Sequence, residues 1–406
     1  MASYLHADRV IATPAALCAA PAILRRSSCC DFDSALTIFF DRPRCLHKAP
    51  IPLCRRSGLR WRAEGGANVS NQDQAPLQNP WQNRRIGSPS TRFIMNATTL
   101  SALCAGDDSE QRRQHEHYAR HSAFSTPGRH SALLDMLPSD PAGVARTAQA
   151  LLIYEHAAEP FYGYRVPEAR RGESHIRPME KMLDTLLVLD DRPLSVARPP
   201  EKRLVGICRH YMLLSVAILR QHGIPARGRG GFATYFNPGK FEDHWVCEYW
   251  KSADGRWVLL DSQLDEVFIR NLGIGFDIHD VPRARFLTAS EAWRRCRSGE
   301  LDPSLFGIEF EQLRGLWFIA GNLIRDLATL NGREVLPWDV WGAQPALNAT
   351  LSHSELDFFD EVALITADPD ANFDALSRRF SEDNKLRLPQ TVFNSLRRRQ
   401  ESVLEG

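Results

Sequence analysis

The stretch Gly206-Ile207-Cys208-Arg209-His210-Tyr211 opens a long apolar run, and it decides how the rest of the chain is interpreted. Residues 208–222 (CRHYMLLSVAILRQH) are apolar on nearly every side, which is typical of a buried helix rather than an amphipathic one. Gly223 supplies a residue that readily becomes left-handed after a helix, and Pro225 prevents continuation. We therefore predict a buried helix over 208–222 with Cys208 in its first turn.

This position has chemical consequences for Cys208. A free thiol has a pKa of about 8.5, and the unpaired N–H groups and positive dipole end of a helix start favour the thiolate. We therefore expect the pKa of the Cys208 thiol to be lowered. We also expect Gly206, which has no side chain, to let a substrate backbone approach closely.

Strands follow the predicted helix. Residues 226–236 (ARGRGGFATYF) form an extended segment, and residues 243–250 (DHWVCEYW) and 256–261 (RWVLLD) are rich in the aromatic and β-branched residues of strands. Residues 251–255 (KSADG) have the composition of a turn, so the last two strands should form an antiparallel hairpin that carries His244 and Asp261.

The hairpin register decides which carboxylate meets His244. A tight turn at Asp254-Gly255 puts Asp265 opposite His244, whereas a longer loop centred near Ser252-Ala253 puts Asp261 there. Both arrangements have the parity needed to place the acid and His244 on the same face of the sheet. Residue patterns alone leave the two alternatives open.

Taken together, these pieces resemble the transglutaminase-like superfamily, most nearly its uncharacterised bacterial members. In that family a nucleophilic Cys starts a helix that ends in "GIPAR", the His begins an "H-x-W-V" type of strand, and the Asp follows a "W-V-x-L-D" strand. The matching residues here are Cys208 with 223–227, His244 with 245–246, and Asp261 at the end of 257–261. The resemblance covers roughly residues 200–265 and implies an α+β, papain-like core, in which a Cys-bearing helix packs on an antiparallel sheet.

The resemblance also implies an activity. Cys208 would be the nucleophile, His244 the base and Asp261 the orienting acid of a thiol-dependent enzyme that forms a thioester at an amide or acyl bond. Transglutaminase, protease and amidase or deamidase activities all fit, with a peptide, protein or small amide as substrate. We expect no cofactor and no metal. The alternative is a catalytically silent transglutaminase-like module that binds a ligand.

Composition bounds the remaining properties. The 406 residues have a net charge of +1, which gives no reason to expect a nucleic-acid partner, and no apolar run reaches the about 18 residues of a membrane span. The nine cysteines show no paired spacing among those after residue 100, so we expect a reduced, cytoplasmic protein. The sequence does not indicate an oligomeric state.

We predict three regions along the chain. Residues 1–94, rich in Pro, Ser, Gly, Asn and Gln, form a disordered extension; 95–300 hold the transglutaminase-like domain with N-terminal helices; and 301–406 form a helical region packed on the core. Helices outside the core are predicted at 141–156, 177–190, 289–298, 309–331 and 354–366.

Overall fold

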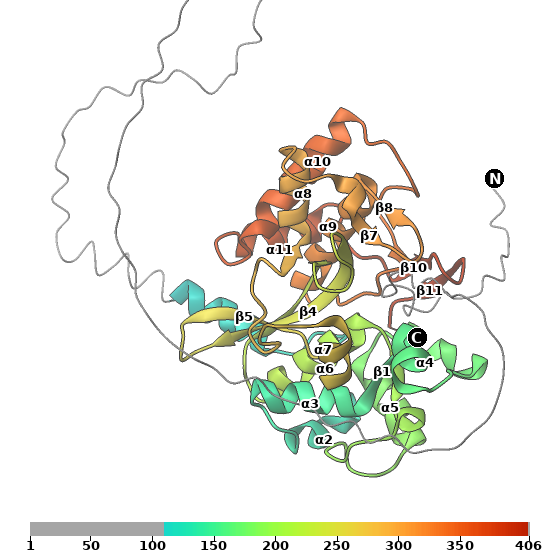
Figure 1. The fold of residues 1–406 in the computed structure, drawn as a ribbon. Coiled ribbons are helices and arrows are strands. Elements are labelled where there is room, and N and C mark those ends of the chain that lie inside the picture. The colour runs from blue at the N-terminus through green and yellow to red at the C-terminus, as the bar shows by residue number, and fades with distance from the viewer. Residues whose placement is uncertain (1–108, 405–406) are drawn as a thin grey trace, which may run out of the picture. The chain divides into compact units, whose positions relative to one another are not determined.

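The computed structural model describes residues 109–404 (Figure 1). Besides a helix at 109–119, the helices are α2 (Ser131–Asp135), α3 (Pro141–Leu151), α4 (Ala158–Tyr162), α5 (Met179–Leu189), α6 (Cys208–Gln221), α7 (Glu266–Leu272), α8 (Ala289–Arg297), α9 (Leu316–Leu330), α10 (His353–Ala367) and α11 (Phe373–Glu382). The strands are β1 (Leu152–Tyr154), β2 (Leu204–Gly206), β3 (Ala226–Ala233), β4 (Phe241–Lys251), β5 (Arg256–Leu260), β6 (Phe286–Thr288), β7 (Phe306–Ile308), β8 (Leu313–Arg314), β9 (Asp339–Val340), β10 (Thr391–Asn394) and β11 (Arg399–Ser402).

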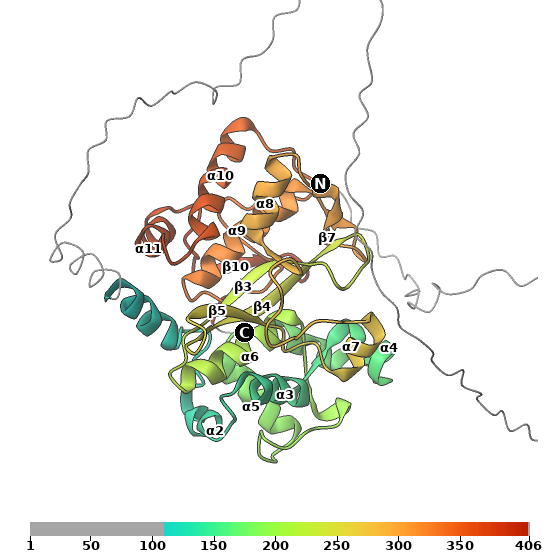
Figure 2. The same cartoon turned by 60° about the vertical axis from the view of Figure 1, so that its left-hand side comes forward.

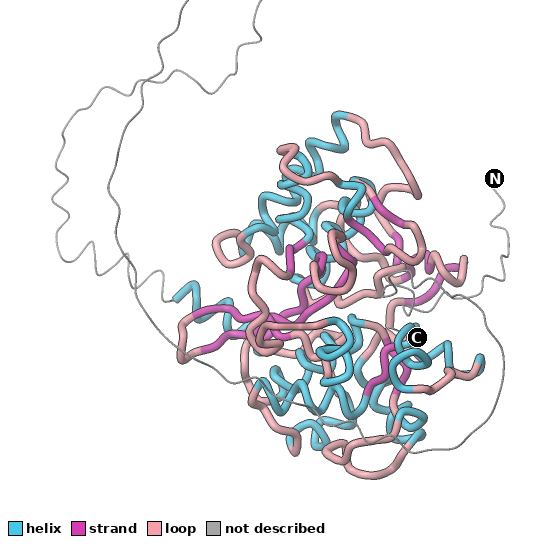
Figure 3. The backbone as a smooth tube through the Cα atoms, in the orientation of Figure 1, coloured by secondary structure: helices cyan, strands magenta, loops and turns pink. Residues whose placement is uncertain are grey.

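A six-stranded sheet forms the centre of the described residues. Its order is β6-β3-β4-β7-β8, and β5 pairs with β4 beside this path. All of its pairings are antiparallel except the short parallel contact between β4 and β7. Figure 3 shows these strands running between two groups of helices, which gives the α+β architecture expected from the sequence.

Helices cover the sheet from both sides. Helix α6 packs against β4 and α9 packs against β3. Figures 1 and 2 show α2, α3, α5 and α6 below the β3–β5 strands and α8 to α11 above them. Every residue of α6 from Cys208 to Arg220 is buried, as its apolar sequence predicts, and Gly223 after it has a left-handed φ of 70°.

Two predicted helices are shorter than expected. The helix predicted at 141–156 ends at Leu151, because Leu152–Tyr154 instead pairs as β1 with β2, parallel to Leu204–Gly206. The helix predicted at 309–331 begins only at Leu316, because β7 and β8 form a hairpin just before it. Helices α5, α8 and α10 lie within two residues of their predicted bounds.

Both expected registers of the β4–β5 hairpin are wrong. Lys251 pairs with Arg256 and Cys247 pairs with Leu260, so the loop consists of residues 252–255 and lies between the two alternatives. Extending this ladder puts Asp261 opposite Val246 rather than opposite His244. Because Val246 and His244 point to the same face of the strand, Asp261 becomes the diagonal neighbour of His244, within reach of its side chain.

Glycines in β3 let neighbouring elements approach its backbone. A Cβ on Gly228 would lie 2.5 Å from Met212 Sδ of α6 and 2.7 Å from Thr329 Cγ2 of α9. A Cβ on Gly231 would clash with the carbonyl oxygen of Leu287 and lie 2.9 Å from Cα of Thr288, on the paired strand β6. These glycines belong to a regular strand that pairs with β4 along its length and with β6 from Gly231 onward, and they serve close packing.

The proposed division of the chain into regions stays a prediction. The chain separates into the units Met1–Ile94 and Met95–Gly406 by its internal contacts, and the expected disorder of 1–94 lies outside the described residues. The region 301–406, expected to be helical, contains α9 to α11 and also β7 to β11. None of the helices between residues 109 and 404 has the length and hydropathy needed to cross a membrane.

Two adjacent glycines of β3 provide a test of this packing. Gly231→Ala should lower the free energy of unfolding by about 1–3 kcal/mol, because the new methyl group meets backbone that cannot move away. Gly230→Ala is the matched control, since its Cβ would find its nearest neighbour at 3.5 Å and should cost nothing. Urea denaturation of both variants measures the difference. Equal stability of the two would contradict the β3–β6 packing.

Candidate active site

Cys208 is the first residue of α6, and the residue after it anchors this helix start. The Arg209 side chain is fully buried and donates to the carbonyl oxygens of Arg177 (2.7 Å) and Glu334 (2.9 Å from Nε). Burial lowers the pKa of Arg209 to about 9. Because these contacts hold the first turn of α6 to two distant segments, they restrict the position of the Cys208 thiol.

His210 also holds the first turn of α6 in place through two hydrogen bonds. Its Nδ1 accepts from the backbone N–H of Ile207 (3.2 Å), so its Nε2 carries the proton and donates to Ile176 O (3.0 Å). A Cβ on Gly206 would lie 3.0 Å from Cβ of His210. The expectation that Gly206 makes room for substrate is therefore wrong, because the His210 side chain occupies that space.

The thiol faces an interruption in the pairing of β4. On the edge opposite β3, β4 pairs with β7 through Phe241 and Glu242 and with β5 only from Cys247 onward. Among the described residues, 243–246 have no strand partner on that edge. The backbone N–H of Trp245 lies in this interval and acts on the Cys208 thiol, so the start of α6 meets the open edge here.

The expectation of a lowered thiol pKa is wrong for this environment. Cys208 is only 7% exposed, and burial raises its pKa well above the ordinary value. The carboxylates of Asp243 and Asp261 raise it further, while the N–H groups of Trp245 and Arg209 lower it. Desolvation and two negative charges outweigh the helix start, so the thiol form is favoured.

His244 and Asp261 form a buried pair on the same face of the sheet. His244 Nε2 lies 2.8 Å from Asp261 Oδ2, and the side chains are 2% and 1% exposed. When the imidazole is neutral, Nε2 carries the proton that Asp261 accepts, so Nδ1 is the basic nitrogen. The pair therefore has the tautomer that a general base needs.

Asp261 has two further donors that the sequence analysis did not identify. The hydroxyl of Tyr235 donates to Oδ2 at 2.6 Å, and the backbone N–H of Gln263 donates to Oδ1 at 3.1 Å. Tyr235 lies in the loop between β3 and β4. The only signal in the sequence was its place in the aromatic pair Tyr235-Phe236, which does not specify a partner.

Asp265, the other carboxylate considered for His244, has a different task. It is the N-cap residue of α7, where its Oδ1 accepts from the N–H groups of Val267 (2.9 Å) and Phe268 (3.0 Å). Its Oδ2 accepts from the Tyr162 hydroxyl at 2.7 Å. Asp265 therefore stabilises a helix start, and Asp261 is the carboxylate beside His244.

Asp243 contributes a second negative charge beside the thiol. Its Oδ1 accepts from Asn322 Nδ2 of α9 at 2.8 Å, and Asn322 Oδ1 accepts in turn from Arg325. Burial raises the pKa of Asp243, and the positive charge of Arg325 opposes this rise. No such role for Asp243, Asn322 or Arg325 was foreseen from the sequence.

One contact of a Cys-His-Asp triad, the hydrogen bond between the thiol and the imidazole, is not made in the part of the chain that the structure describes. No hydrogen bond joins the Cys208 thiol to His244 among residues 109–404, although His244 lies in the same short interval of β4 as Trp245, whose N–H acts on the thiol. Catalytic hydrogen bonds are often long before a substrate is bound. The same part of the chain contains no group of three or more His, Cys, Asp and Glu residues suited to holding a metal ion.

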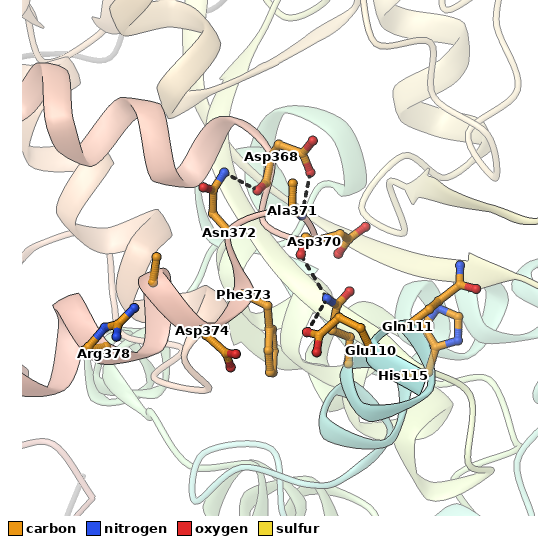
Figure 4. Close-up of a pocket in the computed structure, with 12 residues that line it drawn as sticks. Glu110, Gln111, His115, Asp368, Asp370, Ala371, Asn372, Phe373, Asp374 and Arg378 are labelled. Atoms are coloured by element: carbon orange, nitrogen blue, oxygen red, sulfur yellow. Dashed lines mark hydrogen bonds between the residues drawn. The ribbon is translucent and has the colours of Figure 1, made fainter. Parts of the chain in front are cut away.

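A cavity of about 720 Å³ lies elsewhere, and Figure 4 shows the side chains that line it. It is bordered by the helix at 109–119 and the start of α11, and none of the three candidate catalytic residues lines it. Two of its carboxylates are already paired, Asp370 with Arg227 (2.6 Å) and Asp374 with Arg113 (2.8 Å). The cavity is thus separate from the Cys208 site.

Comparisons with known proteins bear on the segment that carries the site. A family model described as the transglutaminase-like superfamily matches residues 187–262, which include Cys208, His244 and Asp261. None of the curated proteins compared with the chain matches it. A crystal structure from Cytophaga hutchinsonii, named "Putative Cysteine Protease", is 16% identical with a TM-score of 0.24 and covers 42% of this chain and 44% of that chain.

The chain thus spans less than half the length of that solved structure. The similarity to this superfamily lies in residues 187–262, within which α6, β3, β4 and β5 follow one another in this order. Residues 187–262 of this chain are thus similar to the transglutaminase-like superfamily.

Proposed function

We propose that this protein is a thiol-dependent enzyme that acts on an amide or acyl bond through Cys208, His244 and Asp261. The observation that carries the proposal is the buried hydrogen bond between His244 and Asp261, beside the interval of β4 that meets the start of α6. Three different elements supply these side chains, and the pair leaves the basic nitrogen of His244 available.

The proposed reaction begins with proton transfer from Cys208 Sγ to His244 Nδ1. The thiolate attacks the substrate carbonyl carbon, and the backbone N–H of Cys208 at the helix start is the proposed donor to the oxyanion. His244 then protonates the leaving nitrogen as its bond to carbon breaks, which leaves a thioester on Cys208. Attack by water releases an acid, whereas attack by an amine forms a new amide, and either restores the thiol.

The raised pKa of Cys208 favours one version of this mechanism. With burial and Asp243 opposing the thiolate, the resting site would hold Cys208 as a neutral thiol rather than as a thiolate. The proton would then move to His244 as the substrate carbonyl approaches. Asp261 would stabilise the imidazolium at that moment and keep Nδ1 directed at the reaction.

The alternative function is a catalytically silent binding module. The buried thiol, its raised pKa and the lack of a Cys208–His244 hydrogen bond among the described residues favour this alternative. The two functions differ in one product. An enzyme accumulates a thioester on Cys208, and a binding module does not.

Substrate and location are also proposed. We propose a peptide, protein or small amide as substrate, with no nucleic-acid or membrane partner. Cys208, Cys247 and Cys296 are all free thiols, which supports a reducing, cytoplasmic location for the protein.

Trapping the acyl-enzyme tests the proposed function. The protein should be incubated with a glutamine-containing peptide library, with and without a labelled primary amine, and the Cys208 peptide examined by mass spectrometry after acid quench. We expect a thioester on Cys208 that is absent from Cys208→Ala and retained in Cys296→Ala. Amine incorporation identifies transfer, and acid products identify hydrolysis. A bound peptide without any thioester would support the binding module.

The two carboxylates provide a second prediction. Asp261→Asn should lower turnover by about 10²- to 10⁴-fold, because the amide favours the wrong imidazole tautomer. Asp265→Asn should leave turnover nearly unchanged, since Asn also caps helices. Circular dichroism verifies that both variants fold. Loss of turnover in Asp265→Asn but not in Asp261→Asn would contradict the assignment of the acid.

Labelling of Cys208 across pH provides a third prediction. Because its pKa is raised, the rate of alkylation by iodoacetamide should climb with pH through the neutral and alkaline range, without a plateau at low pH. Asp243→Asn removes a charge that opposes the thiolate, so its labelling at pH 7 should be about threefold faster or more. Asp254→Asn, at the tip of the β4–β5 loop, is the control. Equal rates in all three proteins would exclude an effect of Asp243.

A further inference from the structure

The hydroxyl of Tyr235 donates to the oxygen of Asp261 that also faces His244. The distances to Oδ2 are 2.6 Å from Tyr235 Oη and 2.8 Å from His244 Nε2. With Gln263 N–H on Oδ1, the carboxylate has donors on both oxygens and is held in one orientation. A hydrogen bond to a charged group in a buried site is among the stronger ones in a protein.

The hydroxyl remains a donor throughout the working pH range. Burial and the charge of Asp261 raise the pKa of Tyr235 well above its ordinary value. The phenol therefore keeps its proton and remains a hydrogen-bond donor to Asp261. Tyr235 and His244 both donate to Oδ2 of Asp261. The hydrogen bond from Tyr235 therefore weakens the electrostatic interaction of Asp261 with the imidazole.

The ring of Tyr235 also packs against the imidazole of His244. Its centroid lies 5.9 Å from that of His244 at an interplanar angle of 85°, and the Phe236 ring lies 4.8 Å from His244 at 68°. The Phe276 ring also packs against Tyr235, with the two ring centroids 5.2 Å apart. One residue thus supplies a hydrogen bond to the acid and an aromatic contact to the base.

We propose that Tyr235 is a positioning residue of this site, which fixes Asp261 through its hydroxyl and sets how strongly Asp261 holds the His244 imidazolium. This inference rests on the proposed function for its role in catalysis. The coupling of Tyr235, Asp261 and His244 does not require that function, and it is measurable by itself.

The groups that surround His244 determine the sign of the expected effect. They are Asp243 on its own strand, Asp261 after β5 and Tyr235 in the β3–β4 loop. The Cys208 thiol of α6 interacts with both carboxylates. Tyr235→Phe removes a donor to Asp261 and leaves the others in place. The carboxylate then stabilises the imidazolium more strongly, so the protonated form of His244 persists to higher pH.

The experiment follows the His244 ring by NMR in the full chain with labelled histidine, assigned from the spectrum of His244→Gln. In Tyr235→Phe the titration midpoint should move up by about half a pH unit or more. Tyr162→Phe is the matched control, since it loses the same kind of bond to Asp265 (2.7 Å) and should not move His244. In an Asp261→Ala background, Tyr235→Phe should cause no further shift.

A second measurement covers the case in which Tyr235→Phe does not fold. With labelled tyrosine, the resonance of the Tyr235 ring should shift in Asp261→Ala and stay constant in Asp265→Asn. An unchanged His244 titration in folded Tyr235→Phe, or an unchanged tyrosine resonance in Asp261→Ala, would overturn the proposal.

Turnover separates this inference from the proposed function. If a substrate is found, Tyr235→Phe should lower kcat by about threefold to tenfold with KM nearly unchanged, and the acid limb of its pH profile should follow the NMR shift. If the NMR shift is observed but no thioester ever forms, the Tyr235 coupling is supported and the proposed enzymatic function is refuted. If a thioester forms without the NMR shift, the enzymatic function is supported and the Tyr235 coupling is refuted.

Discussion

The unequal pairing of β4 is the constraint on which the candidate site depends. This strand pairs with β3 along most of its length, but its other edge is divided between β7 at the start and β5 at the end. Backbone N–H and C=O groups must find partners when buried, so the interval between them has to be met by another part of the chain. The start of α6 is close to that interval, which carries His244 itself and whose Trp245 N–H acts on the Cys208 thiol.

The charges near residues 243–246 of β4 oppose formation of the Cys208 thiolate before a substrate is bound. Burial together with Asp243 and Asp261 raises the pKa of Cys208, while only backbone N–H groups of Trp245 and Arg209 work against them. A neutral thiol is less reactive toward adventitious electrophiles than a preformed thiolate. Such a site would need the substrate itself to complete the proton transfer, which ties reactivity to binding.

Asp261 and Asp265 lie four residues apart and have different roles because their surroundings differ. Asp261 is buried with three donors, one of them His244, whereas Asp265 caps α7 and accepts from Tyr162. Each has a tyrosine hydroxyl as partner, yet only Asp261 lies on the face that carries His244. The difference arises from the end of β5 at Leu260, after which the chain leaves the ladder and turns toward α7.

The sequence by itself determined the buried helix, its end at Gly223, the β4–β5 hairpin and the identities of Cys208, His244 and Asp261 as candidates, because these follow from local periodicity, turn residues and motif order. Only the tertiary structure decided the hairpin register, since a loop of residues 252–255 differs from its alternatives by few local contacts. It also decided the pKa direction of Cys208, the place of His210 beside Gly206 and the partnership of Tyr235 with Asp261. Desolvation and the charges of distant residues control these properties, and neither is present in a short stretch of sequence.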